Sequence, residues 1–186
     1  MGRPALLFVL EVNDLADSKK NKKKRQGGTA AAVWKLAQPI AEGLGLTVWD
    51  VRFVKEGALW YLRIFIDKPE GVGIEDCEAM SRAVNGPLDE LDPIDGSYCL
   101  EVSSPGINRE LTRPEHFEAF LDCFVIAKLI RPLPDGAREV GGILRARNDD
   151  GSVTLQTGED EAETTTIAPG DLVSVRVMEE DFLEDA

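Results

Sequence analysis

The chain has 186 residues, a formal net charge of −13 and 43% hydrophobic residues. This length suits one large domain or two small ones, and the apolar content is sufficient for a buried core. No apolar run approaches the length of a membrane span, which argues against an integral helical membrane protein.

The first residues differ in charge from the rest of the chain. Residues 1–26 contain seven Lys and Arg against three Asp and Glu, whereas the remaining 160 residues contain 14 against 31. Apolar residues 5–10 precede the basic run Lys19–Arg25, the reverse of the order in a signal peptide. A basic run of this kind is typical of a solvated tail, so we expect residues 1–27 to lie outside the fold as a disordered extension.

Hydrophobic spacing predicts an α-β-β-α-β domain over residues 28–111. Residues 30–42 have helical spacing, with Pro39 expected to kink or restart the helix. Residues 47–54 and 59–67 alternate as strands, and residues from Ile74 onward form a second helix with acidic residues in its first turn.

The last strand of this domain ends in a sequence that carries polar side chains. Tyr98, Leu100 and Val102 alternate with Cys99, Glu101 and Ser103, and Pro105-Gly106 suits a type II turn. The pattern places four polar residues at one exposed edge: Glu101, Ser103, Ser104 and Arg109. Local chemistry alone favours an ordinary strand and turn. Arg109 also has a structural alternative, in which its guanidinium holds Glu101 or a turn carbonyl.

Residues 112–186 predict a second, small β domain with an acidic tail. Thr112-Arg113-Pro114-Glu115 resembles a capping box that begins a short hinge helix. Five short strands with frequent turns follow, and Gly141-Gly142 suggests the bend that closes a small barrel. The predicted strands are residues 124–130, 138–148, 152–156, 164–167 and 173–177. This order suits an SH3-like or Sm-like barrel.

Motifs of catalysis and of cofactor or metal binding are missing. The chain has no GxGxxG, GxxxxGK, HExxH or CxxC motif, and no GxxG clamp. A nucleophilic Ser103 or Ser104 could recruit only the single histidine, His116. Three scattered cysteines argue for a reducing compartment, which we take to be the cytoplasm. We therefore expect no cofactor, no metal and no enzymatic activity.

Several motifs in order resemble the ribosome maturation factor RimP family. The signature is Leu100–Gly106 with Arg109, and the similarity extends from about Ala30 to Glu179. The other matching pairs are Leu44-Gly45 with Asp50-Val51, Leu62-Arg63 with Ile66-Asp67, Gly71-Val72 with Asp76-Cys77, and Ser81-Arg82. The sequence departs from the family pattern at Gly73, Gly86-Pro87, Glu110 and Asp122.

This resemblance implies a KH-like amino-terminal domain, a small carboxy-terminal β-barrel and a non-enzymatic role in ribosome assembly. The partner would be the immature small (30S) ribosomal subunit, with a basic decoding-centre ribosomal protein and nearby ribosomal RNA. The acidic body favours such a basic protein partner. On this interpretation Glu101, Ser103, Ser104 and Arg109 form the contact surface, with Asp67 and Arg82 as weaker candidates. We expect a monomer with no membrane association.

Two other functions remain open from the sequence. The chain could be a stand-alone RNA-binding module that uses the Sm-like barrel. Such barrels usually need aromatic stacking and a basic groove, and this one offers Phe124 and few cations outside Arg145 and Arg147. An acidic body repels phosphate, which argues against this alternative. A hydrolase is the third hypothesis.

Overall fold

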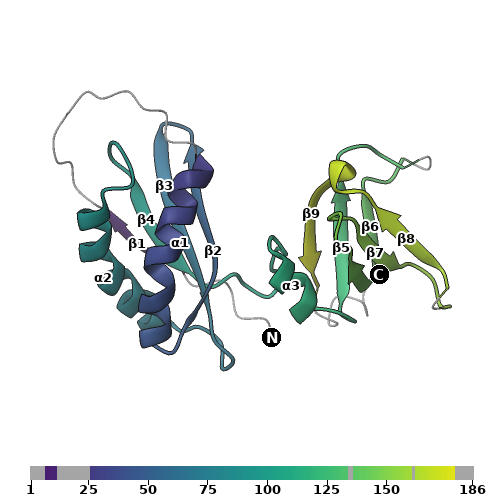
Figure 1. Ribbon diagram of the computed structural model, residues 1–186, viewed down its shortest axis with the longest axis horizontal. Helices are drawn as coiled ribbons and strands as arrows, with labels where there is room; N and C mark the ends of the chain where they lie inside the picture. Colours follow the sequence, from purple (N-terminus) through teal and green to yellow (C-terminus); the bar gives the residue numbers. More distant parts are fainter. Residues whose placement is uncertain (1–6, 12–25, 134–135, 161, 179–186) are drawn as a thin grey trace. The chain divides into compact units, whose positions relative to one another are not determined.

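A computed structural model describes residues 7–11, 26–133, 136–160 and 162–178. The chain divides into two compact units, the first ending at Pro105 and the second beginning at Gly106. Figure 1 shows a mixed α+β protein, with helices and a sheet in the first unit and mainly strands in the second. Within these residues no helix is both long and apolar enough to cross a membrane.

The first unit contains the predicted helix-strand-strand-helix-strand order. Its elements are β1 (Leu7–Glu11), α1 (Gln26–Gly43), β2 (Thr47–Glu56), β3 (Leu59–Asp67), α2 (Ile74–Leu91) and β4 (Cys99–Ser103). The sheet order is β1-β4-β3-β2; β3 and β4 are parallel, and the other two pairs are antiparallel. α1 runs through Pro39 without a restart, and α2 likewise runs through Pro87.

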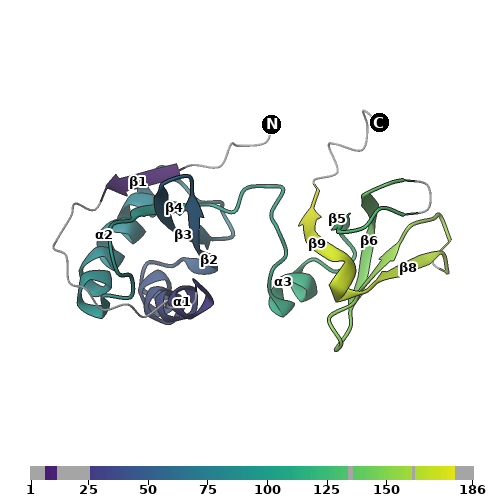
Figure 2. The same cartoon turned by 90° about the horizontal axis from the view of Figure 1, so that it is seen from above.

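Both helices pack on the same face of this sheet (Figure 2). Alternate residues of β3 and β4 point into the core, as the period of a strand requires. The buried core residues are Val33, Ala37 and Ala41 of α1; Cys77, Met80, Val84 and Leu88 of α2; Leu62, Ile64 and Ile66 of β3; and Leu100 and Val102 of β4. Burial raises the pKa of the Cys77 thiol, consistent with an apolar packing role.

The expectation that residues 1–27 lie outside the fold is wrong for part of that range. Leu7–Glu11 pairs with β4 in antiparallel register, from Leu7 opposite Ser103 to Glu11 opposite Cys99. Without β1, one edge of β4 would expose a row of unpaired backbone N–H and C=O groups. Pairing with β1 gives these groups hydrogen-bond partners along the whole strand. α1 also begins at Gln26. The basic run Lys19–Arg25 lies outside the described residues.

The second unit contains the five strands expected from the sequence. Its elements are α3 (Pro114–Ala119), β5 (Phe124–Leu129), β6 (Glu139–Arg147), β7 (Val153–Gln156), β8 (Thr164–Ile167), the 3₁₀ turn η1 (Pro169–Asp171) and β9 (Leu172–Val177). They form one antiparallel sheet in the order β8-β7-β6-β5-β9. Among the described strands β8 and β9 are not paired with each other, so the sheet is open and the expected barrel closure is not seen. The acidic tail, residues 179–186, lies outside the described residues.

The segment before α3 belongs with the second unit. The Leu111 N–H donates to the Val175 carbonyl at 2.8 Å, and the Val177 N–H donates to the Arg109 carbonyl at 3.0 Å. Leu111 is also buried. These contacts extend the second unit upstream of the expected boundary at residue 112. Independent folding of the two units stays a prediction.

Gly142 is required by a close approach between strands. A Cβ at Gly142 would lie 2.4 Å from the backbone oxygen of Gln156, whereas a Cβ at Gly141 would meet the Phe124 side chain at 2.9 Å. A ring can rotate away, but a paired backbone cannot move without breaking its ladder. The glycine pair therefore lets neighbouring groups approach β6 closely, and β6 continues through both glycines as one strand.

We expect Gly142→Ala to destabilise the second unit by about 2 kcal/mol or more, because overpacking against backbone forces the strands apart. Gly141→Ala is the matched control and should have a smaller effect. Urea denaturation of the two variants measures the difference. Equal stabilities would show that β7 moves freely and that the close approach is unimportant.

α2 begins with one half of a capping box, in which a carboxylate of the first turn accepts from the N-cap backbone. The Gly73 N–H donates to Oδ2 of Asp76 at 2.7 Å, and Nζ of Lys68 lies 2.7 Å from the same oxygen. The hydrogen bond from Lys68, followed by that from the Gly73 backbone, lowers the pKa of Asp76 against the opposing effect of burial. Asp76 thus satisfies the Gly73 N–H, one of the backbone donors left without an intrahelical acceptor at the start of α2.

Asp76→Ala should lower the free energy of unfolding by about 1 kcal/mol at pH 7, the usual effect of losing a helix cap. The folded-state pKa is lowered, so this contribution is present above the ordinary carboxyl pKa and is lost as pH falls through the folded value. The stabilities of wild type and variant should therefore converge below about pH 4. Denaturation at pH 7 and pH 3 checks this, and an unchanged difference would contradict the assigned role of the charge.

Candidate functional site

The face of the first sheet opposite the helices carries alternating charged and aromatic residues. We call this the open face and define it by Asp50, Arg52 and Glu56 of β2, Tyr61, Arg63 and Phe65 of β3, and Glu101 and Ser103 of β4. The register places Arg52 opposite Arg63 and Arg63 opposite Glu101. These residues therefore share one side of three neighbouring strands.

Arg63 is held between two carboxylates. Its Nε lies 2.5 Å from Oε2 of Glu101, and its two terminal nitrogens contact the Glu56 carboxylate at 2.6 and 2.9 Å. Its guanidinium carbon also lies 5.0 Å from the centroid of the Tyr61 ring. Hydrogen bonds to Glu56 and Glu101 raise the pKa of Arg63, and the hydrogen bond from Arg63 lowers the pKa of Glu56. The planar guanidinium is thus fixed by charge, hydrogen bonding and stacking together.

A second arginine repeats this arrangement on β2. Nε of Arg52 lies 2.9 Å from Oδ2 of Asp50, and its guanidinium carbon is 5.3 Å from the centroid of the Phe65 ring. The other Asp50 oxygen accepts the Val51 N–H at 2.9 Å. The open face therefore presents two arginine–aromatic pairs, each anchored by a buried or largely buried carboxylate.

The structure corrects the predicted exposure of the signature strand. Glu101 is only 8% exposed and Ser103 only 6% exposed, so neither stands on an outward edge. β4 lies between β1 and β3, and side chains of an interior strand are flanked from both sides even on the face without helices. Ser104, just beyond the strand, is half-buried. Glu101 is paired with Arg63, which was not among the predicted site residues.

The weaker candidates lie at other places in the first unit. Asp67 is half-buried at the end of β3 and pairs in register with Thr47. Arg82 is 73% exposed on α2 and forms an ion pair with Glu78 one helical turn away. Because α2 covers the opposite face of the sheet, the structure does not bring Arg82 into the open face.

Arg109 belongs to the second unit, where it has a structural role. Its Nε donates to the Gly106 carbonyl at 3.1 Å, and its guanidinium carbon lies 5.7 Å from the centroid of the Phe120 ring. Gly106 has a φ of +78°, the left-handed conformation that the predicted turn requires. This geometry matches the alternative in which Arg109 holds a turn carbonyl.

His116 is occupied as a helix cap. It is 6% exposed, and its Nδ1 accepts the Thr112 N–H at 3.2 Å and the Arg113 N–H at 3.4 Å. A ring nitrogen so engaged does not serve as a general base. The described residues also contain no group of three His, Cys, Asp or Glu that could hold a metal.

The open face was missed because its partners are distant in sequence. Arg63 and Glu101 are separated by 38 residues, and only the parallel pairing of β3 with β4 joins them. The alternation of Tyr61, Arg63 and Phe65 with apolar residues was the available signal.

Comparison with known families identifies the same part of the chain. Residues 36–108 match the family model described as the RimP N-terminal domain. The matched range contains β2, β3, α2 and β4, and with them every residue of the open face. The resemblance drawn from the sequence motifs is thereby confirmed over residues 36–108, which are similar to the RimP N-terminal domain.

Proposed function

We propose that this protein is a ribosome maturation factor that binds the immature small (30S) ribosomal subunit through its open face. The observation that carries the proposal is that the RimP N-terminal match covers the residues that build the two arginine–aromatic pairs. We assign it no catalytic step and no cofactor. Its action is transient binding in the cytoplasm, as a monomer.

The composition of the open face supports a protein partner. Tyrosine, phenylalanine and arginine are enriched where protein interfaces derive most of their binding energy. Arg52, Arg63, Tyr61 and Phe65 are only partly exposed, so a partner would bury them fully without ordering flexible side chains. The paired carboxylates fix the arginines in advance.

Charge favours a basic partner. Residues 27–105 contain six Lys and Arg against 13 Asp and Glu. On the open face, the carboxylates of Asp50, Glu56 and Glu101 outnumber the two arginines. Such a surface attracts a basic ribosomal protein of the decoding centre and repels bare phosphate. Nearby ribosomal RNA is then a secondary contact.

The predicted contact residues take new roles in this proposal. Glu101 and Ser103 position the face from within the sheet, while half-buried Asp67 and Ser104 lie at strand ends where a partner can reach. Arg82 remains a separate candidate on α2. Arg109 holds the turn at Gly106 and contributes to binding only through that turn.

The alternative of an RNA-binding barrel is weakened at one of its residues. Arg145 donates to Oε1 of Gln156 at 2.9 Å and forms an ion pair with Asp122 at 2.5 Å. Its guanidinium is therefore already engaged. The guanidinium carbon of Arg147, in contrast, lies 5.5 Å from the centroid of the Phe117 ring.

Neutralising the central ion pair should abolish subunit binding while keeping the fold. Arg63→Ala alone leaves Glu101 buried and unpaired, which we expect to destabilise the first unit by about 3 kcal/mol. The double variant Arg63→Met with Glu101→Gln removes both charges and should recover most of that stability. It should nevertheless bind small subunits at least tenfold more weakly, because the anchored guanidinium is gone.

Sucrose gradients with free small subunits and with whole ribosomes measure this binding. Wild type should travel with the free subunits, and Lys55→Ala is the matched control, because Lys55 lies on β2 with its ammonium over Trp60 on the helix side. Normal subunit binding by a well-folded double variant would exclude the open face as the binding surface. If Arg82→Ala were the only variant to lose binding, the contact surface would be on α2.

A further inference from the structure

The outer edge of β8 has no partner among the described strands. There β8 pairs with β7 alone, and Figure 1 shows it as the outer strand on one side of the second sheet. The edge of β9, the opposite outer strand, is covered by hydrogen bonds to the segment that contains Arg109 and Leu111. β8 contains no charged residue and no proline, which commonly protect an exposed edge. It is therefore open to pairing with another extended chain.

The register shows which backbone groups of β8 point outward. The Thr157 N–H donates to the Glu163 carbonyl at 2.9 Å, which makes these two residues a hydrogen-bonded pair. Such pairs alternate along an antiparallel ladder, so Thr166, opposite Thr154, directs its N–H and C=O away from β7. Thr166 is exposed, and within the described residues neither of these groups has a hydrogen-bond partner.

A groove of about 420 Å³ lies beside this edge. It is lined by the successive residues 165–168, whose side chains alternate in direction, so the groove reaches the edge of the strand as well as one face. Its floor is apolar, because the lining residues Leu129, Val140 and Ile167 are all buried. Leu133 adds an apolar side chain that is 36% exposed.

The other wall of the groove, residues 131–133, has few donors with which to pair β8. Pro132 has no N–H, and the Leu133 N–H donates to the Ala137 carbonyl at 2.8 Å. Just before this wall, the Ile130 N–H donates to the Asp171 carbonyl at 2.8 Å. The sheet therefore stays open at this point, and the edge of β8 is left for a different chain.

We propose that an extended peptide segment with alternating apolar and basic side chains adds to β8 and occupies this groove. Its backbone hydrogen-bonds to the N–H and C=O of Thr166, as in strand addition to other exposed sheet edges. Successive side chains of a strand alternate, so its apolar side chains lie over the buried floor and its basic ones face solvent. One ligand thereby satisfies both the backbone groups and the apolar floor.

Charge favours a basic peptide. The segment that leads into β8, residues 158–163, contains four carboxylates and no Lys or Arg. Among the described residues that line the groove, the charged ones are Arg131 and Asp171, which form an ion pair at 3.3 Å. Lysines of an added strand therefore pass an acidic segment and meet no unpaired cation in the groove. A basic ribosomal protein can supply such a segment, so the source of the peptide, though not the groove, rests on the proposed function.

The same features disfavour the segments that this protein could itself supply. Residues 179–186 contain five carboxylates, which the acidic segment before β8 would repel. The basic run Lys19–Arg25 has no apolar residue to cover the floor. A second copy paired through β8 would bring two acidic segments to one interface.

Fluorescence anisotropy of the full chain with a labelled octapeptide of alternating valine and lysine tests the site. Methylating the backbone nitrogens of the valines blocks one edge of this peptide, and methylating those of the lysines blocks the other. One of the two methylated peptides should bind at least tenfold more weakly, because its hydrogen bonds to β8 are lost, while the other should change less than threefold. Replacing the lysines by glutamates should also weaken binding at least tenfold.

Thr166→Pro removes the outward N–H without breaking a bond to β7, a position where an edge strand accepts proline. It should melt near wild type and bind the valine–lysine peptide at least tenfold more weakly. Thr166→Ala is the matched control, because it keeps the N–H, and it should bind within twofold of wild type. If Thr166→Pro does not fold, the two methylated peptides decide the question with the wild-type chain.

Four results would overturn the proposal: no saturable binding at millimolar protein, equal effects of the two methylations, equal binding of the glutamate peptide, or normal binding by folded Thr166→Pro. A dimer of the full chain that Thr166→Pro dissociates would identify a second copy as the occupant instead. Loss of peptide binding only in the double variant Arg63→Met with Glu101→Gln would place the peptide on the open face. Normal subunit binding by Thr166→Pro would leave the proposed function unaffected, since the two surfaces are tested by different ligands.

Discussion

The contact between Arg63 and Glu101 is the interaction on which the open face of the first unit depends. It joins β3 to β4 across the parallel pair, and its carboxylate lies in a largely buried position. A buried charge is tolerated only with a well-placed partner, so the guanidinium has little freedom to turn away. Glu56 and Tyr61 then fix the remaining sides of the same group. A rigid cation on an otherwise acidic domain is the result.

The order of helices and strands could be predicted from local patterns, because periods of two and 3.6 residues are visible in a single sequence. The same patterns could not show that Leu7–Glu11 pairs with β4, since a five-residue strand beside a basic run has little signal of its own. This pairing makes β4 an interior strand. Glu101 points toward the face of the sheet without helices, as predicted. Its predicted exposure to solvent was wrong, because exposure depends on neighbours that come from distant segments of the chain.

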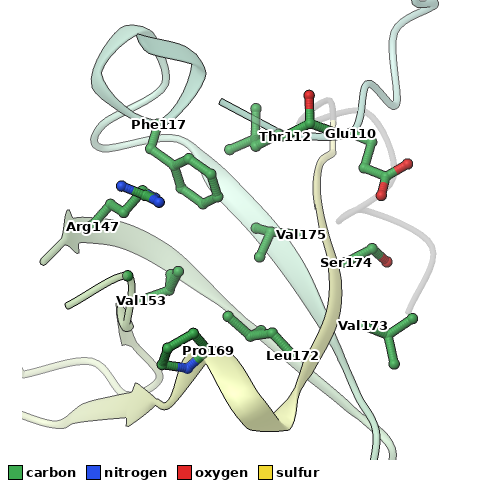
Figure 3. Close-up of a pocket in the computed structure, with 12 residues that line it drawn as sticks. Glu110, Thr112, Phe117, Arg147, Val153, Pro169, Leu172, Val173, Ser174 and Val175 are labelled. Carbon is green, nitrogen blue, oxygen red and sulfur yellow. The ribbon is translucent and has the colours of Figure 1, made fainter. Parts of the chain in front are cut away.

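The candidate site was predictable only where it coincided with a recognisable motif. Glu101, Ser103 and Arg109 were selected by resemblance, yet the structure gives Glu101 and Arg109 supporting roles within their own units. Arg52, Arg63, Tyr61 and Phe65 became visible once the register of three strands was known. The second unit also contains a cavity, shown in Figure 3, whose walls come from the segment before α3, α3 itself, the β6–β7 hairpin, η1 and β9, so no single segment of the sequence marks it.

The central claim is that the open face is the surface buried on the small ribosomal subunit. Hydroxyl-radical footprinting tests it most directly, because the half-buried rings of Tyr61 and Phe65 report their own solvent access. Adding free small subunits should protect both rings, and adding whole ribosomes should leave their reactivity unchanged. Unchanged reactivity of both rings in a complex that demonstrably forms, with protection on α1 or α2 in their place, would contradict the account.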